Sequence, residues 1–175
     1  MARPMTTRTD TARFDPPIES RDDLLRPFAG GEKPKESWRI GTEHEKFVYR
    51  LADHGAPSYD EPGGIRDLLN EMTAFGWSPV VEGGNVIALS GPDGTISLEP
   101  AGQLELSGAQ RTHLHETCAE AGRHLKQAKA VGDKLGLGFL GLGMWPDKAR
   151  ADLPVMPKGR YKIMLDYMPK VGSLG

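Results

Sequence analysis

Two glutamates, Glu43 and Glu45, stand two residues apart in the segment RIGTEHEKF, which otherwise has the composition of a β-strand. Because side chains alternate between the two faces of a strand, both carboxylates are expected on one face, about 6–7 Å apart. Carboxylates that converge without a counter-charge repel each other, and a divalent cation such as Mg²⁺ removes that repulsion. The spacing permits a metal site, but spacing alone favours a solvated sheet face whose acids pair with Lys46, Arg39 or Arg111.

A second acidic segment follows further along the chain. The runs NVIALS and TISLEP alternate apolar and polar residues and are joined by Gly-Pro-Asp-Gly, which predicts a β-hairpin. Glu99 lies at the end of the second run, and Glu105 lies in GQLELSG, which we expect to continue the strand after a β-bulge at residues 100–102. If both acidic segments face the same hollow, four carboxylates converge there, and a divalent cation would offset their charge.

A basic segment, MPKGRYKIM, lies in the last quarter of the sequence. It places Lys158, Arg160 and Lys162 around Gly159, at the start of a short helix that we expect over about residues 160–167. Backbone amides at the start of a helix, together with nearby cations, suit a phosphate or carboxylate group. Taken by itself, the segment favours a solvated basic helix start over an anion site. The sequence contains no Walker-type or dinucleotide-binding glycine pattern.

The rest of the sequence predicts the elements that position these side chains. Capping residues and apolar periodicity indicate an order of α, β, α, β, β-hairpin, α, β, α. The expected ranges are 20–30, 37–50, 63–75, 78–82, the hairpin at 85–100, 112–135, 137–144 and 160–167. Hairpins mixed with helices favour an α+β fold with a largely antiparallel sheet.

Two of these helices have apolar faces that predict how they pack. The helix at 63–75 presents a face formed by Ile65, Leu68, Leu69 and Met72. The helix at 112–135 presents a stripe formed by Leu114, Cys118, Ala121, Leu125, Ala128 and Val131. Cys118 is therefore expected to be a buried core thiol and not a nucleophile.

The overall composition bounds the class of protein. The chain has 175 residues, of which 26% are charged and 38% hydrophobic, and this suits one globular domain with its own core. Its net charge of −2 gives no electrostatic reason to expect a nucleic-acid partner. No apolar run approaches the roughly 20 residues that a membrane span needs, so no membrane association is expected.

The N-terminal residues and the cysteine content suggest boundaries and a compartment. Residues 1–20 contain no apolar segment of the secretory type, and Asp10 and Asp15 argue against an organelle transit peptide. A single cysteine excludes an internal disulfide framework and suits a reducing compartment. We therefore expect a flexible arm over residues 1–19, a folded domain over residues 20–175 and a cytoplasmic location.

Several long segments in order resemble one family, the plant and proteobacterial type of glutamate–cysteine ligase. They are RIGTEHEKF, SLEPAGQLELSGA, HETCAE, GFLGLGMWP and MPKGRYKIMLDYMPKVGSLG. The resemblance implies a glutamine synthetase-like fold with a curved, mostly antiparallel sheet flanked by helices, of which this chain would be the N-terminal part. It also implies that ATP phosphorylates the γ-carboxylate of L-glutamate and that the amine of L-cysteine then displaces phosphate. The product would be γ-glutamylcysteine, in the first step of glutathione biosynthesis, with Mg²⁺ on an acidic floor of the sheet.

The same resemblance assigns roles to residues at the matching positions. The residues assigned as metal ligands or neighbours of the glutamate site are Glu43, Glu45, Glu99 and Glu105. Lys158 and Arg160 are assigned to the anionic substrate or the acyl-phosphate, and Met156 and Tyr161 to the lining of the substrate pocket.

The length of the chain qualifies what the resemblance implies. Members of the family run to several hundred residues, so we expect these 175 residues alone to be inactive and the contacts to ATP to lie elsewhere. Two alternatives remain open at this point. One is another ligase of the same superfamily that joins glutamate to a different amine, and the other is a non-catalytic binding module.

Overall fold

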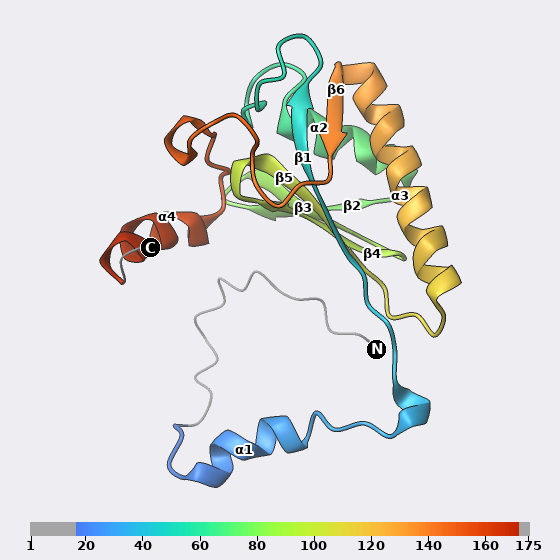
Figure 1. Cartoon of the computed structure of the whole chain (residues 1–175), viewed down its shortest axis with the longest axis vertical. Helices are drawn as coiled ribbons and strands as arrows, with labels where there is room; N and C mark the ends of the chain where they lie inside the picture. The colour runs from blue at the N-terminus through green and yellow to red at the C-terminus, as the bar shows by residue number, and fades with distance from the viewer. Residues whose placement is uncertain (1–16, 172–175) are drawn as a thin grey trace.

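The central element is a six-stranded sheet in which every pair of neighbouring strands is antiparallel, in the order β2-β3-β4-β5-β1-β6 (Figure 1). The computed structural model describes residues 17–171. The strands are β1 (Glu43–Arg50), β2 (Ser78–Glu82), β3 (Asn85–Gly91), β4 (Gly94–Glu99), β5 (Gln103–Gly108) and β6 (Leu137–Leu140). The α+β class with a mostly antiparallel sheet flanked by helices is therefore confirmed. Of the predicted N-terminal arm, residues 1–16 lie outside the described residues.

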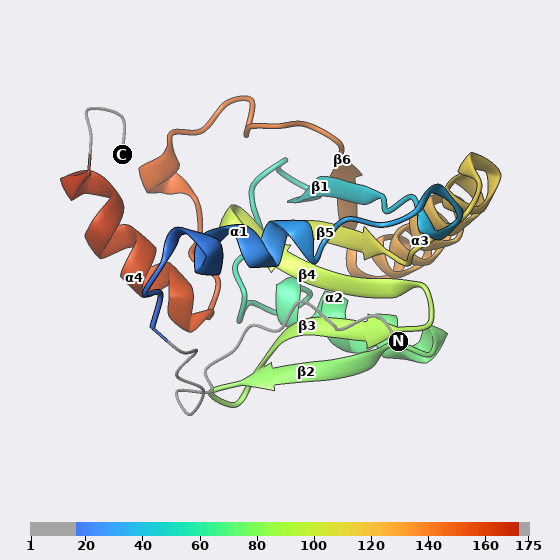
Figure 2. The ribbon, with the colours of Figure 1, turned by 90° about the horizontal axis from the view of Figure 1, so that it is seen from below.

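Four helices accompany the sheet: α1 (Arg21–Ala29), α2 (Ile65–Met72), α3 (Leu114–Leu135) and α4 (Gly159–Tyr167). The helices α2 and α3 contact each other and pack on the sheet, α2 against β3 and α3 against β5 and β6. Seen from below in Figure 2, α1 lies on the side of the sheet that is turned away from α2. Among residues 17–171, no helix combines the length and the apolar character that crossing a bilayer requires.

The ends of the helices follow from local sequence. Ser20 caps α1 by accepting the backbone N–H of Asp23, whose carboxylate in turn accepts the N–H of Ser20 at 2.9 Å. At the start of α3, Glu116 accepts the backbone N–H groups of Thr112 and His113. Gly136 ends α3 with a φ of 71°, a left-handed conformation that favours glycine. These boundaries lie within two residues of those expected from the sequence.

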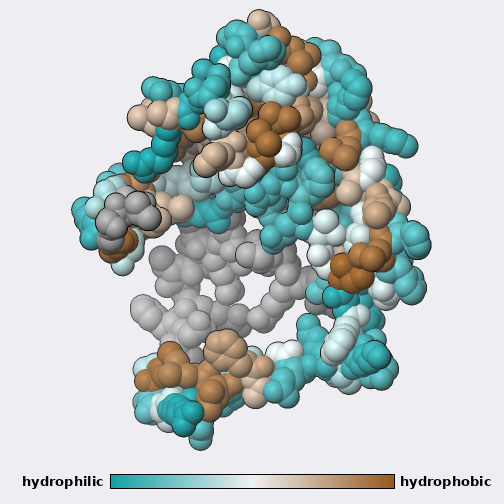
Figure 3. All heavy atoms as spheres, in the orientation of Figure 1, coloured by the Kyte–Doolittle hydropathy of each residue, from teal (hydrophilic) through white to brown (hydrophobic). Residues whose placement is uncertain are grey.

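The hydrophobic core lies between the sheet and the pair α2 and α3. It contains Val48, Ile65, Leu68, Leu69, Met72, Leu89, Ile96, Leu98, Leu104, Leu106 and Val131. The predicted apolar face of α2 is confirmed, because Ile65, Leu68, Leu69 and Met72 have no exposed surface. In contrast, α1 has no buried residue, and its apolar side chains, such as the 80% exposed Phe28, form the brown patch at the bottom of Figure 3.

The first strand is shorter than the sequence indicated. A strand over residues 37–50 was predicted, whereas β1 begins at Glu43 and only an isolated bridge joins Ile40 to Arg111. The neighbouring strand β5 ends at Gly108, so the segment before Glu43 has no continuous ladder to complete. Trp38 is therefore 64% exposed and does not take part in the core, contrary to the expectation from alternation.

The segment 100–102 is a tight turn and not the predicted β-bulge. Ala101 and Gly102 have φ angles of 64° and 73°, which reverse the chain so that Gln103 pairs with Glu99. The strand β5 therefore runs antiparallel to β4 on one edge and antiparallel to β1 on its other edge. This reversal places Glu105 in the interior of the sheet, between Ser97 and Glu45.

The buried face of α3 also differs from the predicted stripe in its first half. Leu114 is 67% exposed, Leu125 is 43% exposed, and Cys118 is exposed instead of being a core thiol. The buried residues of α3 are Thr117, Glu120, His124, Ala128, Val131 and Gly132. Polar side chains can occupy this face because partners from the sheet and its loops satisfy them, as described below. The last strand is shorter than predicted as well, since β6 ends at Leu140.

Candidate active site

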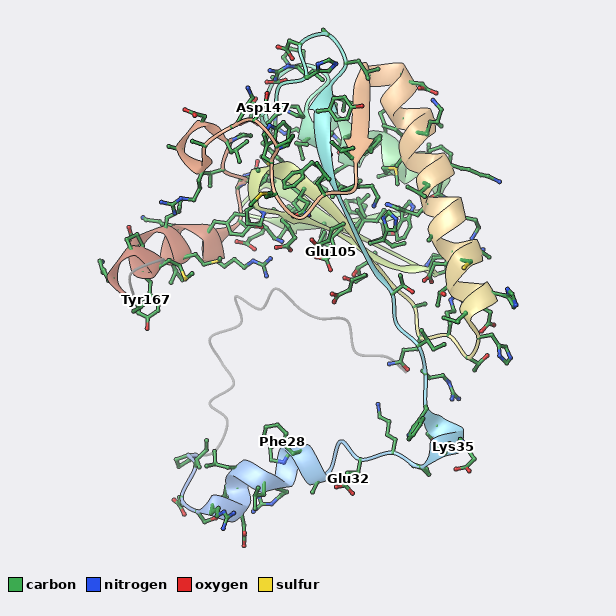
Figure 4. All side chains as sticks on the ribbon, in the orientation of Figure 1. Phe28, Glu32, Lys35, Glu105, Asp147 and Tyr167 are labelled. Atoms are coloured by element: carbon green, nitrogen blue, oxygen red, sulfur yellow. The ribbon has the colours of Figure 1, made fainter. Side chains whose placement is uncertain are left out.

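The two central acids stand on adjacent strands of the sheet. In the register of β1 and β5, Glu45 lies directly opposite Glu105, and Glu43 lies opposite Ser107. Their neighbours Leu104 and Leu106 are fully buried on the helix-covered face, so alternation places the acids on the other face. Figure 4 shows the labelled Glu105 side chain projecting from the sheet on the side where α1 lies. Two carboxylates therefore lie directly opposite each other on an open face, an arrangement in which like charges destabilise a sheet.

Neutral polar groups surround this pair. Glu45 accepts a hydrogen bond from the amide of Gln103 at 2.9 Å. Glu105 accepts one from Ser107 at 2.7 Å and one from Ser97 at 3.2 Å. These three polar residues were not assigned a role from the sequence, although each occupies a position that alternation places on the same face as the acids. The acidic face is thus a continuous set of oxygen and amide groups.

The basic segment meets the acidic face at Glu99. Arg160 donates to both carboxylate oxygens of Glu99, at 2.8 and 3.1 Å, and the Lys158 ammonium lies 3.7 Å away. Ser97 connects this cluster to the central pair, because its hydroxyl lies 3.4 Å from Glu99 and 3.2 Å from Glu105. Sequence-predicted residues from two distant segments are therefore brought together.

Lys158 and Tyr161 are anchored to the end of β4. The Lys158 ammonium and the Tyr161 hydroxyl both donate to the carbonyl of Leu98, at 2.5 and 3.0 Å. Burial lowers the pKa of Lys158, which the Glu99 carboxylate opposes, and burial raises the pKa of Tyr161 to about 12. Lys158 is thus fixed in place, while the Arg160 side chain, 47% exposed, can still reach a ligand.

A pocket adjoins this basic cluster. It has a volume of about 450 Å³ and lies between the turn at 100–102, the segment 153–156 and α4. Met156 and Tyr161 line it, together with several apolar residues of α4. The two residues assigned to a substrate pocket therefore do share one cavity, and their substrate contacts remain a prediction.

The buried face of the same strands carries a cation. Lys46 is 1% exposed, and its ammonium donates to the carbonyls of His44 and Leu104, at 2.9 and 3.4 Å, and to Nε2 of His124, at 2.8 Å. Burial lowers the pKa of Lys46 to about 8, and the carboxylates of Glu105 and Glu45 oppose this effect. Burial, reinforced by Lys46, lowers the pKa of His124 to about 3, so this imidazole is neutral.

The cations considered as partners of the acids on a solvated face are engaged elsewhere. Lys46 points to the opposite face of the sheet. Arg39 donates to the backbone carbonyls of Glu36 and Trp38. Arg111 binds the buried Glu120 of α3 and Asp93 of the turn between β3 and β4.

The donor set decides which metal ion the acidic face could hold. Among residues 17–171, no three His, Cys, Asp or Glu side chains form a group that could hold an ion. The expected convergence of four carboxylates is therefore not formed, because Glu43 lies beyond the pair and Glu99 is bound by Arg160. However, Mg²⁺ commonly binds one or two carboxylates and takes its other oxygens from water and phosphate, and the pair Glu45 and Glu105 fits that pattern. The assignment of the four acids as ligands stays a prediction.

Comparison with known proteins places this geometry in a family. Residues 39–175 match the profile of Glutamate-cysteine ligase family 2 (GCS2). Over 157 residues the chain is 54% identical to the chloroplastic glutamate–cysteine ligase B of Oryza sativa subsp. japonica, 52% identical to the chloroplastic enzyme of Brassica juncea and 50% identical to that of Arabidopsis thaliana. These alignments cover 89% of this chain and 30–31% of the relatives, so the chain spans about three tenths of their length.

The names of the relatives correct one expectation. A cytoplasmic location was predicted, and it is contradicted because each of these relatives is named chloroplastic. The prediction rested on the composition of the chain and on two aspartates near its N-terminus. Composition reflects the folding requirements of a domain, whereas a compartment is set by targeting segments that are read separately from the fold.

Proposed function

This chain belongs to Glutamate-cysteine ligase family 2, and from that premise we propose that the whole protein joins the γ-carboxylate of L-glutamate to the amine of L-cysteine at the expense of ATP. In the proposed route, a γ-carboxylate oxygen attacks the terminal phosphorus of ATP, which releases ADP and leaves an acyl-phosphate. The cysteine amine then attacks the acyl carbon, phosphate departs, and the nitrogen loses a proton. The products are γ-glutamylcysteine, ADP and phosphate.

The observation that carries this proposal is the pair Glu45 and Glu105, opposed on an open face in a chain of this family. Phosphoryl transfer places negative charge on oxygens that must be neutralised, and most of its catalysis consists of positioning and electrostatics. Mg²⁺ held by this pair would supply that positive charge. The hydroxyl and amide groups of Ser97, Ser107 and Gln103 hold the two carboxylates in fixed orientations.

Arg160 is proposed to bind the anionic substrate. One nitrogen of its guanidinium donates to both oxygens of the Glu99 carboxylate, and its other N–H groups could serve a substrate carboxylate or the acyl-phosphate. Lys158 contributes a second positive charge from a fixed position near Glu99. Met156 and Tyr161 are proposed to line the part of the pocket that receives the carbon skeleton of a substrate.

The test uses the whole protein with the double substitution Glu45→Gln and Glu105→Gln, and follows γ-glutamylcysteine and ADP formation. Loss of a metal that contributes several kcal/mol to the transition state should lower turnover by at least about 100-fold. Glu43→Gln is the comparison on β1: Glu43 lies opposite Ser107 of β5 and not opposite a second acid, so its effect should be smaller than that of the double variant.

Three other results would each contradict one part of the proposal. Unchanged turnover in the double variant would contradict the metal assignment. Faster product formation with an amine other than cysteine would favour the related ligase of different specificity. ATP consumption that is independent of glutamate would remove the acyl-phosphate route.

A further inference from the structure

The ammonium of Lys46 occupies an unusual place for a lysine. It is buried beneath the sheet, and its three hydrogen-bond partners, two backbone carbonyls and the neutral imidazole of His124, are uncharged. Removing an ammonium from water without a paired anion is strongly unfavourable, and buried lysines are normally paired for that reason. Something outside its hydrogen-bond shell must therefore compensate for the charge.

The two carbonyls that bind Lys46 belong to the peptide groups in front of the two central acids. The carbonyl of His44 is joined to the nitrogen of Glu45, and the carbonyl of Leu104 is joined to the nitrogen of Glu105. The ammonium thus sits under the backbone at the point where the two acids are opposed, with the sheet between them.

Among residues 17–171, neither acid forms an ion pair on its own face. They stand directly across from each other, where like charges destabilise a sheet, and their hydrogen-bond donors Gln103, Ser97 and Ser107 are all neutral. Arg160 and Lys158 are engaged with Glu99 on β4, and Glu105 is the weakest of the charges that act on Lys158. The cation under the sheet and the anions above it thus complement each other.

We propose that Lys46 is the resident counter-cation of the pair Glu45 and Glu105, holding the two carboxylates opposite each other when no metal ion is bound. Lys46 is thereby a positioning residue that acts through the two acids. A metal ion bound on the open face would take over the neutralisation and would be repelled by the ammonium through the sheet. This second consequence rests on the proposed function, whereas the first does not.

The first experiment measures coupling without metal. The urea midpoint of the whole protein is determined in EDTA for the wild type, Lys46→Met, Glu45→Gln and the double variant. The loss of midpoint caused by Lys46→Met should be smaller in the Glu45→Gln background, because one of the two attractions is already absent. Equal losses in both backgrounds would show that Lys46 is only a buried hydrogen-bond donor and would overturn the proposal.

The second experiment adds the metal. Mn²⁺ binding is measured by calorimetry in the wild type, Lys46→Met and Lys46→Arg, the last of which keeps the charge. Lys46→Met should bind Mn²⁺ about three- to tenfold more tightly, since it lacks the repelling ammonium, and Lys46→Arg should resemble the wild type. Equal affinities in Lys46→Met and the wild type would contradict the electrostatic role. Absence of Mn²⁺ binding in all three would contradict the proposed metal site and leave the coupling experiment to decide on Lys46.

A failure to fold is also informative. If Lys46→Met unfolds in EDTA and folds when Mn²⁺ is added, or folds once Glu45→Gln is combined with it, the counter-charge role is supported. If neither change restores the fold while Lys46→Leu/His124→Leu does, Lys46 serves only the packing of α3 and the proposal is wrong.

Discussion

The two faces of the strand pair β1 and β5 carry charges of opposite sign, and one face is exposed to solvent while the other is buried. One face carries Glu45 and Glu105, which are surrounded by neutral hydrogen-bond donors. On the other face, Lys46 is buried against α3 and contacts the neutral His124 of that helix. Water screens charges on the open face, whereas the buried face depends on fixed partners. A strand with alternating side chains can thus place carboxylates on one face and an ammonium on the other, only a sheet thickness apart.

The largest expected effect comes from breaking a charge pair on the buried side. The Glu120 side chain is 1% exposed, and Arg111 donates to it at 2.7 and 3.0 Å. Arg111→Met leaves that carboxylate buried without its cation and should destabilise the protein by about 3–5 kcal/mol. Urea denaturation measures the loss.

Arg123→Met is the matched control for this prediction. Arg123 binds Asp93 in the same network, but its side chain is 49% exposed, so its removal should cost no more than about 1 kcal/mol. Similar losses in the two variants would mean that burial does not govern the strength of these ion pairs.

A substitution on the open face should change the activity of the protein and leave its stability nearly unchanged. Arg160→Met in the whole protein should lower kcat/KM by about 100- to 1,000-fold, the range seen when one donor to a developing anion is lost. Its free energy of unfolding should change by less than about 1 kcal/mol, because its pair with Glu99 is half exposed. Steady-state kinetics and urea denaturation of the same preparation separate the two effects, and a purely structural Arg160 would reverse them.

The buried face should also depend on pH. The pKa of His124 is lowered to about 3 in the folded chain from an ordinary 6.5, so the unfolded chain binds more protons between these values. The contribution of neutral His124 is complete above pH 6.5 and is lost as the pH falls toward 3, at no more than about 1.4 kcal/mol per pH unit.

Comparing urea midpoints of the wild type and His124→Gln between pH 7 and pH 4 isolates this contribution from that of other groups. The wild type should lose more stability than the variant across this range. Parallel curves would indicate that His124 becomes protonated inside the folded protein.

The smallest expected effect concerns the exposed side of α3. Cys118 is exposed, so Cys118→Ser should change the free energy of unfolding by less than about 0.5 kcal/mol. A loss of more than 1 kcal/mol in thermal or urea denaturation would instead support the buried thiol that the helical pattern predicted.

These contrasts explain which parts of the molecule could be read from the sequence. The face of α2 and the turn that joins β3 to β4 were predicted correctly because local periodicity and turn chemistry determine them. The placement of Glu45 and Glu105 on one face likewise follows from alternation. That the two lie directly opposite each other depends on the direction of β5, which was not predicted correctly.

The errors arose where distant partners decide burial. Glu120 and His124 take the buried face of α3 because Arg111 and Lys46 meet them there, and no pattern within the helix contains that information. Trp38 was expected in the core, and it is exposed because no strand extends far enough to pair with its segment. Periodicity predicts burial wrongly for side chains whose counter-charge or packing partner belongs to another element.

The opposed carboxylates of Glu45 and Glu105 are proposed to hold the divalent cation of the reaction. Calorimetric titration of the whole protein with Mn²⁺, compared between the wild type and the Glu45→Gln/Glu105→Gln variant, tests it most directly. We expect saturable binding in the wild type that is weakened by at least about tenfold in the variant, since both charged ligands are lost. Equal affinity in the two proteins would contradict it.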